Sequence, residues 1–393
     1  MQKLPLASFA IFHLSCQVLV YHEAEGKTWH ILNDGSGDAP TIQAGVDSGT
    51  VGDTVLVAPG TYYENVDSLG NGLTLLSAGG PAMTVIDGTQ RGSVIRITGN
   101  SRVQGFTLQN GLNDRGGGIQ ASANYVSIVD NIIKENRAGS EVDFGLGGGI
   151  ALNTTEGGII EANTIINNYA GDSGGGIIVG SRAQVIGNKI ISNGCHVDGG
   201  GISAGTETVI SGNLVLENWS DNFGGGISAQ GATITNNTVV SNYINNGAVP
   251  QAAGIAISDT RVVSQGVIAE NNIVVLNHGP LGAGTGIGIG CSNSYGLTTL
   301  KCNDVWGNDI DYFVSSGCDT ASLGNITLDP KFCNLAVGDF EIDMTSPCAP
   351  NNSANCGLIG ALSVGCQVVQ ERHATWGRLK ALFGSMKGKG EVR

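Results

Sequence analysis

Through the middle of the chain, short runs of residues recur in which apolar and polar positions alternate. One such run extends from Asn188 to Asn193, with Ile190 at an apolar position between the two asparagines. A period of two residues is typical of β-strands, and the repeated copies hold no amphipathic stretch of helical length. The pattern therefore predicts a succession of short strands.

These runs belong to a repeat of about 25 residues. Each copy begins with a glycine cluster followed by isoleucine, at residues 116–119, 147–150, 174–177, 199–202 and 224–227, with degenerate copies at 253–255 and 286–287. Each copy then carries two asparagines five positions apart: Asn131/Asn136, Asn163/Asn168, Asn188/Asn193, Asn213/Asn218, Asn237/Asn242, Asn272/Asn277 and Asn303/Asn308. Gly105/Asn110 fits the same frame, with glycine in the first position.

A repeat of this length, made of short strands, can close one coil of a solenoid whose coils stack about 4.8 Å apart. The sequence thus predicts an all-β, right-handed parallel β-helix. We expect each asparagine at a corner, in the left-handed conformation, with its amide bonded to local backbone or to the next amide in a ladder. The glycine clusters suit positions where a side chain would crowd the neighbouring coil.

Two parts of the chain resemble pectin-lyase-like β-helix proteins. Residues 40–47 (PTIQAGVD) and 52–65 (GDTVLVAPGTYYEN) resemble the opening of this superfamily, and residues 302–308, 324–332, 338–340, 346–348 and 359–361 resemble the last coils of its uncharacterised exported bacterial members. The resemblance implies a short N-terminal helix that caps the first coil. Ile42 and Val46 would face the coil, and Asp38 would cap the helix before Pro40.

The expected organisation has five parts. Residues 1–24 read as a signal peptide, because Lys3 precedes a largely apolar run; Cys16 within it leaves a lipoprotein signal as an alternative. Residues 25–50 form the N-terminal cap, 51–290 the coils, and 291–367 the final coils and a disulfide-stapled cap over the open end. Residues 368–393 form a basic amphipathic tail, which is either frayed or an anchoring helix.

Composition narrows the class of protein. Glycine accounts for 63 of 393 residues without a Gly-X-Y period, which excludes collagen. The net charge of −14 argues against nucleic acid as a partner, and the absence of an 18-residue apolar run argues against a transmembrane helix. Seven of the nine cysteines fall within residues 291–366 without zinc-site spacing, so we expect disulfides formed in an oxidising compartment. The signal peptide and the resemblance imply export by a bacterium, to the medium or the cell surface, and we expect a monomer.

Candidate chemistry gathers in the loops that follow the second asparagine of each copy. Before the glycine clusters stand five aspartates, which are calcium ligands, acid/base groups or plain turn residues: Asp114, Asp143, Asp172, Asp198 and Asp221. Just after the second asparagine stand rings that would suit sugars or cover the coil edge, Tyr169, Trp219 and Tyr243. His196, in the same region, is a candidate base or a solvated loop residue.

Lyases of the resembled superfamily use calcium held by aspartates together with an arginine or lysine base. This resemblance makes Asp114, Arg115, Arg137 and Asp143 the candidate constellation, with Ca²⁺ as the one expected cofactor and no organic cofactor. Two functions stay open on the sequence. One is a calcium-dependent lyase of acidic polysaccharide; the other is a non-catalytic adhesin, glycan-binding or structural β-helix that meets a cell-surface glycan.

Overall fold

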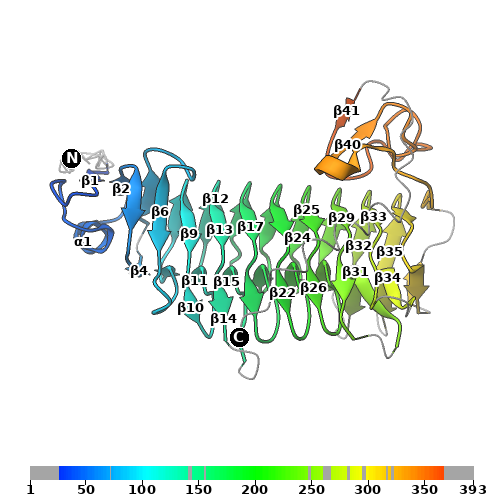
Figure 1. Cartoon of the computed structure of the whole chain (residues 1–393), viewed down its shortest axis with the longest axis horizontal. Helices are drawn as coiled ribbons and strands as arrows, with labels where there is room; N and C mark the ends of the chain where they lie inside the picture. The colour runs from blue at the N-terminus through cyan, green and yellow to red at the C-terminus, as the bar shows by residue number, and fades with distance from the viewer. Residues whose placement is uncertain are drawn as a thin grey trace, which may run out of the picture.

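The chain forms a parallel β-helix, which confirms the predicted fold class (Figure 1). This computed structural model describes residues 26–366, except residues 71, 140–143, 155, 247–248, 260–266, 281–283, 294–297, 316 and 320–322. The proposed signal peptide and the basic tail therefore lie outside the described residues. Among the described residues, no helix is long and apolar enough to cross a membrane.

Three long parallel sheets form the walls of the solenoid, and we name them A, B and C. Sheet A contains β1 (Thr28–Ile31), β2 (Thr54–Val57), β5 (Thr74–Ser77), β8 (Ser101–Gln104), β12 (Val126–Val129), β16 (Ile159–Glu161), β20 (Gln184–Ile186), β24 (Val209–Ser211), β28 (Thr233–Thr235), β32 (Ile268–Glu270), β35 (Thr298–Lys301) and β38 (Cys318–Asp319). Sheet B contains β3 (Gly60–Tyr62), β6 (Thr84–Asp87), β9 (Thr107–Gln109), β13 (Ile132–Lys134), β17 (Thr164–Ile166), β21 (Lys189–Ile191), β25 (Leu214–Leu216), β29 (Thr238–Val240), β33 (Ile273–Val275) and β36 (Asp304–Trp306).

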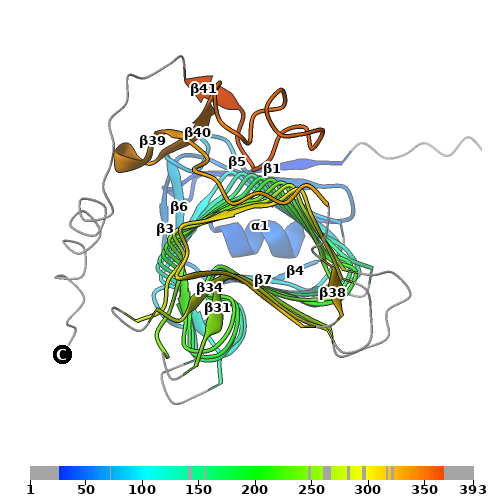
Figure 2. The same ribbon diagram turned by 90° about the vertical axis from the view of Figure 1, so that its right-hand side faces the viewer.

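Sheet C contains β4 (Val66–Leu69), β7 (Ile95–Ile97), β11 (Ile119–Ala123), β15 (Ile150–Thr154), β19 (Ile177–Val179), β23 (Ile202–Ala204), β27 (Ile227–Gln230), β31 (Gln251–Asp259), β34 (Gly286–Asn293) and β37 (Ile310–Val314). A fourth, narrow sheet D contains β10 (Leu112–Asn113), β14 (Arg137–Ala138), β18 (Tyr169–Ala170), β22 (Gly194–Cys195), β26 (Trp219–Ser220) and β30 (Tyr243–Ile244). A regular coil passes through sheets C, A, B and D in that order, as β15, β16, β17 and β18 do. Sheet D forms a lobe at one edge of sheet C (Figure 2).

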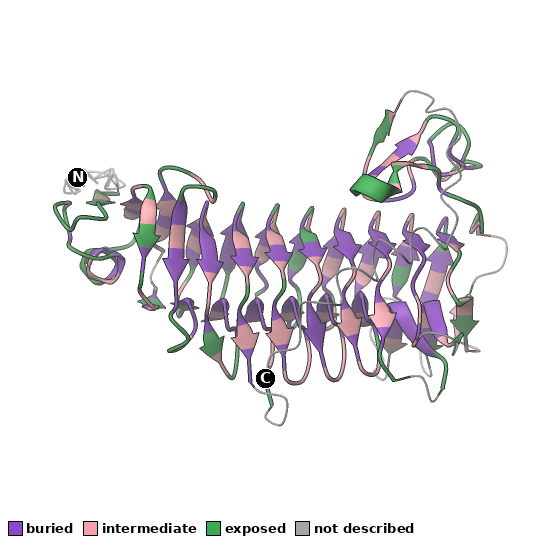
Figure 3. Cartoon of the chain, in the orientation of Figure 1, coloured by how far each residue is buried: buried purple, intermediate pink, exposed green. Residues whose placement is uncertain are grey.

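The interior is filled by rows of apolar side chains that stack in register. The isoleucine after each glycine cluster forms one row through sheet C, in which Ile150 pairs with Ile177 and Ile177 with Ile202. These side chains are fully buried, and buried positions continue along the length of the coils (Figure 3). Each such side chain contributes roughly 1.5–3 kcal/mol of hydrophobic stabilisation.

Two buried asparagine ladders hold the corners of the coils. In both ladders the amide oxygen of one asparagine accepts from the backbone N–H and the side-chain Nδ2 of the preceding one; Asn163 donates both bonds to Asn188 Oδ1, at 2.9 and 3.0 Å. The first ladder joins sheets A and B: Asn131, Asn163, Asn188, Asn213, Asn237, Asn272, Asn303 and Asn325. The second joins sheets B and D: Asn136, Asn168, Asn193, Asn218, Asn242, Asn277 and Asn308. The predicted ladder is confirmed.

The backbone conformation at these corners differs from the expectation in one respect. The left-handed residue is the one before each asparagine, such as Ala162 (φ 55°) and Ser192 (φ 53°). The pair Gly105/Asn110 was assigned one position too early for the same reason, because these two residues have positive φ. Phe106 and Gly111 occupy the ladder positions there, since their backbone N–H groups donate to Asn131 and Asn136 Oδ1.

The first coil is closed by the short helix α1 (Ile42–Ser48), seen lying across the coil opening in Figure 2. Ile42 and Val46 are buried, as predicted. The predicted cap is wrong: Thr41 is the N-cap, because its hydroxyl accepts from Ala44 N–H at 3.0 Å. Asp38 instead accepts from His30 N–H in the turn before the helix.

The C-terminal segment packs against the outside of sheet B. It contains β39 (Phe332–Asn334), the 3₁₀ turn η1 (Leu335–Val337), β40 (Asp339–Asp343) and β41 (Val364–Cys366). Its buried side chains, including Phe340, Ile342 and Ile359, share a cluster with outward residues of sheet B. The predicted position over the open end is therefore wrong for these residues, because the outer face of sheet B is itself apolar here and needs covering.

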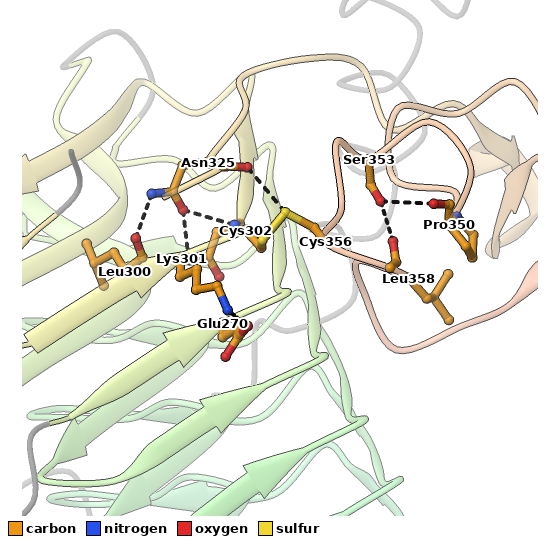
Figure 4. The surroundings of a disulfide bond; sticks show 12 residues. Glu270, Leu300, Lys301, Cys302, Asn325, Pro350, Ser353, Cys356 and Leu358 are labelled. Carbon is orange, nitrogen blue, oxygen red and sulfur yellow. Dashed lines mark hydrogen bonds and ion pairs between the residues drawn. A yellow bond between two sulfur atoms is a disulfide. The ribbon is translucent and has the colours of Figure 1, made fainter. Parts of the chain in front are cut away.

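Three disulfides lie in the C-terminal region. Cys291–Cys318 joins two coils, Cys302–Cys356 ties the C-terminal segment to a coil (Figure 4), and Cys333–Cys366 closes the segment on itself. The predicted disulfides are thus present, and they are consistent with an extracellular compartment. Cys195 and Cys348 are buried free thiols.

A buried carboxyl group lies where the C-terminal segment meets sheet B. Asp304 Oδ2 accepts from the Cys348 thiol at 3.0 Å, and Oδ1 accepts from Leu328 N–H at 3.1 Å. Burial raises the pKa of Asp304 to about 6, although these two hydrogen bonds oppose the shift. The folded protein thus holds a proton on Asp304 at a pH where an unfolded aspartate is ionised.

We expect Asn188→Ala to lower the free energy of unfolding by about 3 kcal/mol or more. The substitution leaves the buried Asn163 N–H without its acceptor, which costs about 1–3 kcal/mol. It also removes the hydrogen bonds from Asn188 Nδ2 to Ile160 O, Ile186 O and Asn213 Oδ1, each of which contributes about 0.5–1.5 kcal/mol. Urea denaturation measures the loss. Asn222→Ala, at a half-buried loop asparagine outside both ladders, is the control and should change stability by less than about 1 kcal/mol. Equal losses in the two variants would contradict the role of the ladder.

The raised pKa of Asp304 predicts that stability falls as pH rises. Its contribution is fully present below the unfolded pKa near 4 and is lost as pH passes through about 6, for a total of roughly 3 kcal/mol. The D304N variant should lack this component. The measurement is the difference in unfolding free energy between wild type and variant at pH 4, 5, 6 and 7; a constant difference would contradict the assignment.

Candidate functional site

Sheet D and the turns that lead from it to sheet C carry most of the residues singled out from the sequence. Backbone pairing places Arg137, Tyr169, Gly194, Trp219, Tyr243 and His278 in one row along sheet D, directly after the second asparagine ladder. The predicted row of rings is therefore a physical neighbourhood. It is interrupted only at Gly194.

Within this row the rings contact one another. Trp219 stacks on Tyr243 with centroids 6.4 Å apart, and Tyr243 stacks on His278 at 5.7 Å. Trp219 also covers Gly194, where a Cβ atom would lie 2.0 Å from the indole, and so reaches Tyr169 at 6.1 Å. His196 packs edge-on against both Tyr169 and Trp219.

This stacking bears on the two interpretations of the rings. A sugar ring binds best to an open aromatic face, whereas these faces are largely turned toward neighbouring rings. All of Tyr169, Trp219 and Tyr243 are half-buried, and burial raises the pKa of Tyr243 to about 12. The arrangement favours a row that covers the coil edge. A substrate-binding role for these three residues stays a prediction.

The predicted aspartates do not form one column. Asp114, Gly145 and Asp172 lie in one row across three successive coils. Leu146 N–H donates to Asp114 O, and Asp172 N–H donates to Gly145 O. Asp198 lies in a second row, in which it pairs with Phe223 of the next coil. Asp221 lies in a third row, where its side chain contacts His196 of the preceding coil. Asp143 lies outside the described residues.

Two of these carboxylates have distinctive surroundings. Asp221 Oδ2 lies 2.5 Å from His196 Nδ1, and its other oxygen accepts from Asn245 Nδ2 at 3.0 Å. Burial, with a smaller contribution from the charge of Asp172, raises the pKa of Asp198 to about 6. One oxygen of Asp198 is buried and accepts no hydrogen bond from a described residue. Asp198 is thus the aspartate of this corner best suited to carry a proton.

The described aspartates do not fit the expected calcium site. A calcium ion needs six to eight oxygen ligands around one point. Among the described residues, the only close group of three histidine, cysteine, aspartate or glutamate side chains is Cys333, Asp339 and Glu341, and Cys333 is held in a disulfide. Asp114, Asp172, Asp198 and Asp221 do not converge in this way.

The two candidate arginines have different surroundings. Arg137 places its guanidinium 4.5 Å from the centre of the Tyr169 ring and donates from Nε to Gly139 O at 3.0 Å. Arg115 is exposed and lines an open hollow on the outer face of sheet C, with Gln120, Ser122 and Asn153. No ion pair among the described residues joins Asp114, Arg115 and Arg137, and the proposed constellation of these residues with Asp143 stays a prediction.

A second hollow adjoins the first along the same face. It is lined by Arg91 and Arg96 with Asn65, Asp67 and Asn113. Arg96 pairs in register with Gln120, and Asn113 Nδ2 donates to Gln120 Oε1 at 3.3 Å, so the two hollows are continuous. Arg96 also forms an ion pair with Asp67.

The sequence analysis missed Arg91 and Arg96. The available signal was the alternation Ile95-Arg96-Ile97, which turns Arg96 outward on the face that later carries Gln120. It also missed Phe144 and Phe223, whose rings are 84% and 50% exposed on the corner beside the ring row. Unlike the stacked rings, these two leave most or half of their surface open.

The fold of this chain has a counterpart among solved structures. No family model matches the sequence, and no curated protein matches it. Among solved structures, the chain is similar to pectate lyase Pel9A, with 13% identity, a TM-score of 0.42, and coverage of 87% of this chain and 97% of that one. At this identity the likeness concerns the fold.

The position of Trp219 over Gly194 predicts a specific sensitivity. Gly194→Ala should displace the indole, because its Cβ would overlap Cε2 and Nε1, and should cost about 1–3 kcal/mol. Near-UV circular dichroism and tryptophan emission report the displacement. Gly92→Ala is the matched control, since its Cβ would meet only Asn65 Nδ2 at 3.8 Å. An unchanged indole spectrum in Gly194→Ala would contradict the packing.

Proposed function

We propose that this protein binds an acidic polysaccharide outside the cell, along the outer face of sheet C, without cleaving it. The observation that carries the proposal is the gathering of three exposed arginines, Arg91, Arg96 and Arg115, around two continuous hollows. The chain as a whole has a net charge of −14, so a cationic site of this kind is local and specific.

Charge favours an anionic ligand at this place. A guanidinium binds carboxylate or sulfate through two parallel hydrogen bonds, and such bonds are stronger than neutral ones. Arg91 and Arg115 form no ion pair with a described residue, so their donors are open to a ligand. Elsewhere the acidic surface would repel a polyanion, which directs it to this end of the face.

The floor of the face suits an extended chain. Outward positions of sheet C beyond Gln120 carry Ala151, Ile178, Ser203 and Ser228 in register, so small side chains flank a single isoleucine. Gln120, Ser122 and Asn153 add neutral hydrogen-bonding groups of the kind that hydroxyl-rich ligands use. The lobe formed by sheet D borders the face along one edge (Figure 2).

Binding is favoured over catalysis by the state of the candidate catalytic groups. The guanidinium of Arg137 contacts the Tyr169 ring and donates to Gly139 O, and the described aspartates lie in three different rows along the solenoid. Lyase chemistry needs a base and a charge stabiliser at one point on the substrate. The calcium-dependent lyase is therefore the alternative that the test must be able to detect.

We expect Arg115→Ala or Arg91→Ala to weaken binding to an acidic polysaccharide about tenfold or more, because each removes a charge-assisted contact of about 1.5–3 kcal/mol. Binding of residues 25–393 to a panel of acidic and neutral polysaccharides provides the measurement. Raising the salt concentration should weaken it further.

Arg182→Ala is the control, because Arg182 is also exposed but pairs with Glu207 and lines neither hollow. It should leave affinity unchanged. Unsaturated or reducing ends should not form, with calcium or with chelator. Turnover that disappears with chelator would replace the proposal by the lyase, and equal losses in all three arginine variants would reduce it to non-specific attraction.

A further inference from the structure

One acidic side chain stands inside the cationic face of sheet C. Asp67 lines the second hollow together with Arg91 and Arg96, and among the described residues that line either hollow it alone carries a carboxylate. A negative charge at this place lowers the affinity of the face for an anion, because like charges repel at short range. The presence of Asp67 therefore needs a reason other than attraction of the ligand.

The carboxylate of Asp67 occupies the guanidinium of Arg96. Arg96 Nε donates to Asp67 Oδ1, and Arg96 Nη2 donates to Ser68 Oγ at 3.2 Å. These two nitrogens form an edge of the guanidinium that can bind a carboxylate or sulfate through two parallel hydrogen bonds. Since Arg91 and Arg115 form no ion pair with a described residue, Arg96 differs from them in being already paired.

The backbone of Asp67 is held by the helix that closes the first coil. Gln43, on α1, accepts from Asp67 N–H at 2.6 Å and donates to Asp67 O at 3.0 Å. The hydrogen bond from Arg96 lowers the pKa of Asp67, so the carboxylate is ionised at neutral pH. Its side chain is nevertheless 57% exposed. The charge is thus fixed at the hollow, where a ligand can reach the ion pair.

We infer that Asp67 competes with the anionic ligand for Arg96 and thereby sets how much charge a ligand needs in order to bind. This inference rests on the proposed binding of an acidic polysaccharide to the same face. An exposed ion pair is weak on its own, so a ligand carboxylate or sulfate can displace Asp67. Displacement is favoured when Arg91 and Arg115 bind other anionic groups of the same ligand, because those contacts raise its local concentration at Arg96. The face then selects polymers with several neighbouring anionic groups over molecules with one.

Asp67→Asn tests the inference, because it keeps the size of the side chain and removes its charge. We expect the variant of residues 25–393 to bind dextran sulfate and carboxymethyl cellulose about two- to fivefold more tightly than the wild type, which corresponds to the loss of one exposed ion pair. Asp47→Asn is the matched control. It removes one exposed negative charge from α1, Asp47 lines neither hollow, and the affinity should not change.

A double-mutant cycle with Arg96→Ala shows whether the effect passes through the ion pair. If Asp67 acts through Arg96, the gain from Asp67→Asn disappears when residue 96 is alanine. A gain of equal size in both backgrounds would overturn the inference, because it would indicate general repulsion of the ligand. Unchanged affinity in Asp67→Asn would overturn it as well. Circular dichroism and thermal melting establish that all variants are folded.

A titration with inorganic sulfate separates this inference from the proposed function. Nuclear magnetic resonance of the arginine Nε–H groups follows each guanidinium in the absence of polysaccharide. The Arg96 signal should respond at about two- to fivefold lower sulfate concentration in Asp67→Asn than in the wild type. If no polysaccharide binds and this contrast is present, the proposed function fails and the competition for Arg96 is retained. Equal sulfate dependence in the two proteins overturns the inference, whether or not a polysaccharide binds.

Discussion

Both buried asparagine ladders require every coil to present its amide at the same height and in the same orientation. A single amide misplaced by one residue would leave several buried donors and acceptors unpaired, which costs more than the coil gains from one buried isoleucine. The ladders therefore fix the register of sheets A, B and D. The isoleucine rows, the ring row and the outward positions of sheet C follow from that register.

The same register determines which candidate residues meet. It places rings directly above one another in sheet D, and so it turns their faces toward each other rather than toward a ligand. It separates the aspartates, because an aspartate that stands one residue nearer to its glycine cluster falls in a different row along the solenoid. On sheet C it brings Arg96 and Gln120 side by side, although 24 positions separate them in the sequence.

The sequence predicted the coils and the ladders well because both depend on short periods that can be counted along the chain. It predicted the corner chemistry less well, since aspartates grouped by their place before a glycine cluster, such as Asp172 and Asp198, differ by one residue in their offset and lie in different rows of the corner. The helix cap at Thr41 differs from Asp38 through local hydrogen bonds that spacing alone does not decide. The docking of Phe340 and Ile342 on sheet B joins segments more than a hundred residues apart, which no local pattern reveals.

The ladder asparagines advance by one coil at each step, although the number of residues per step varies from 22 to 35. One coil is therefore the unit of length of this fold. Residues 188–212 could be removed as a block, and Asn163 would then face Asn213 and Asn168 would face Asn218 with both ladders unbroken. The loss would fall elsewhere: Tyr169 would meet Trp219 directly, without the space that Gly194 provides. A solenoid of this kind can thus grow or shorten by whole coils while its interior stays the same. The change would be visible only on the surface, where rows of side chains would gain new neighbours.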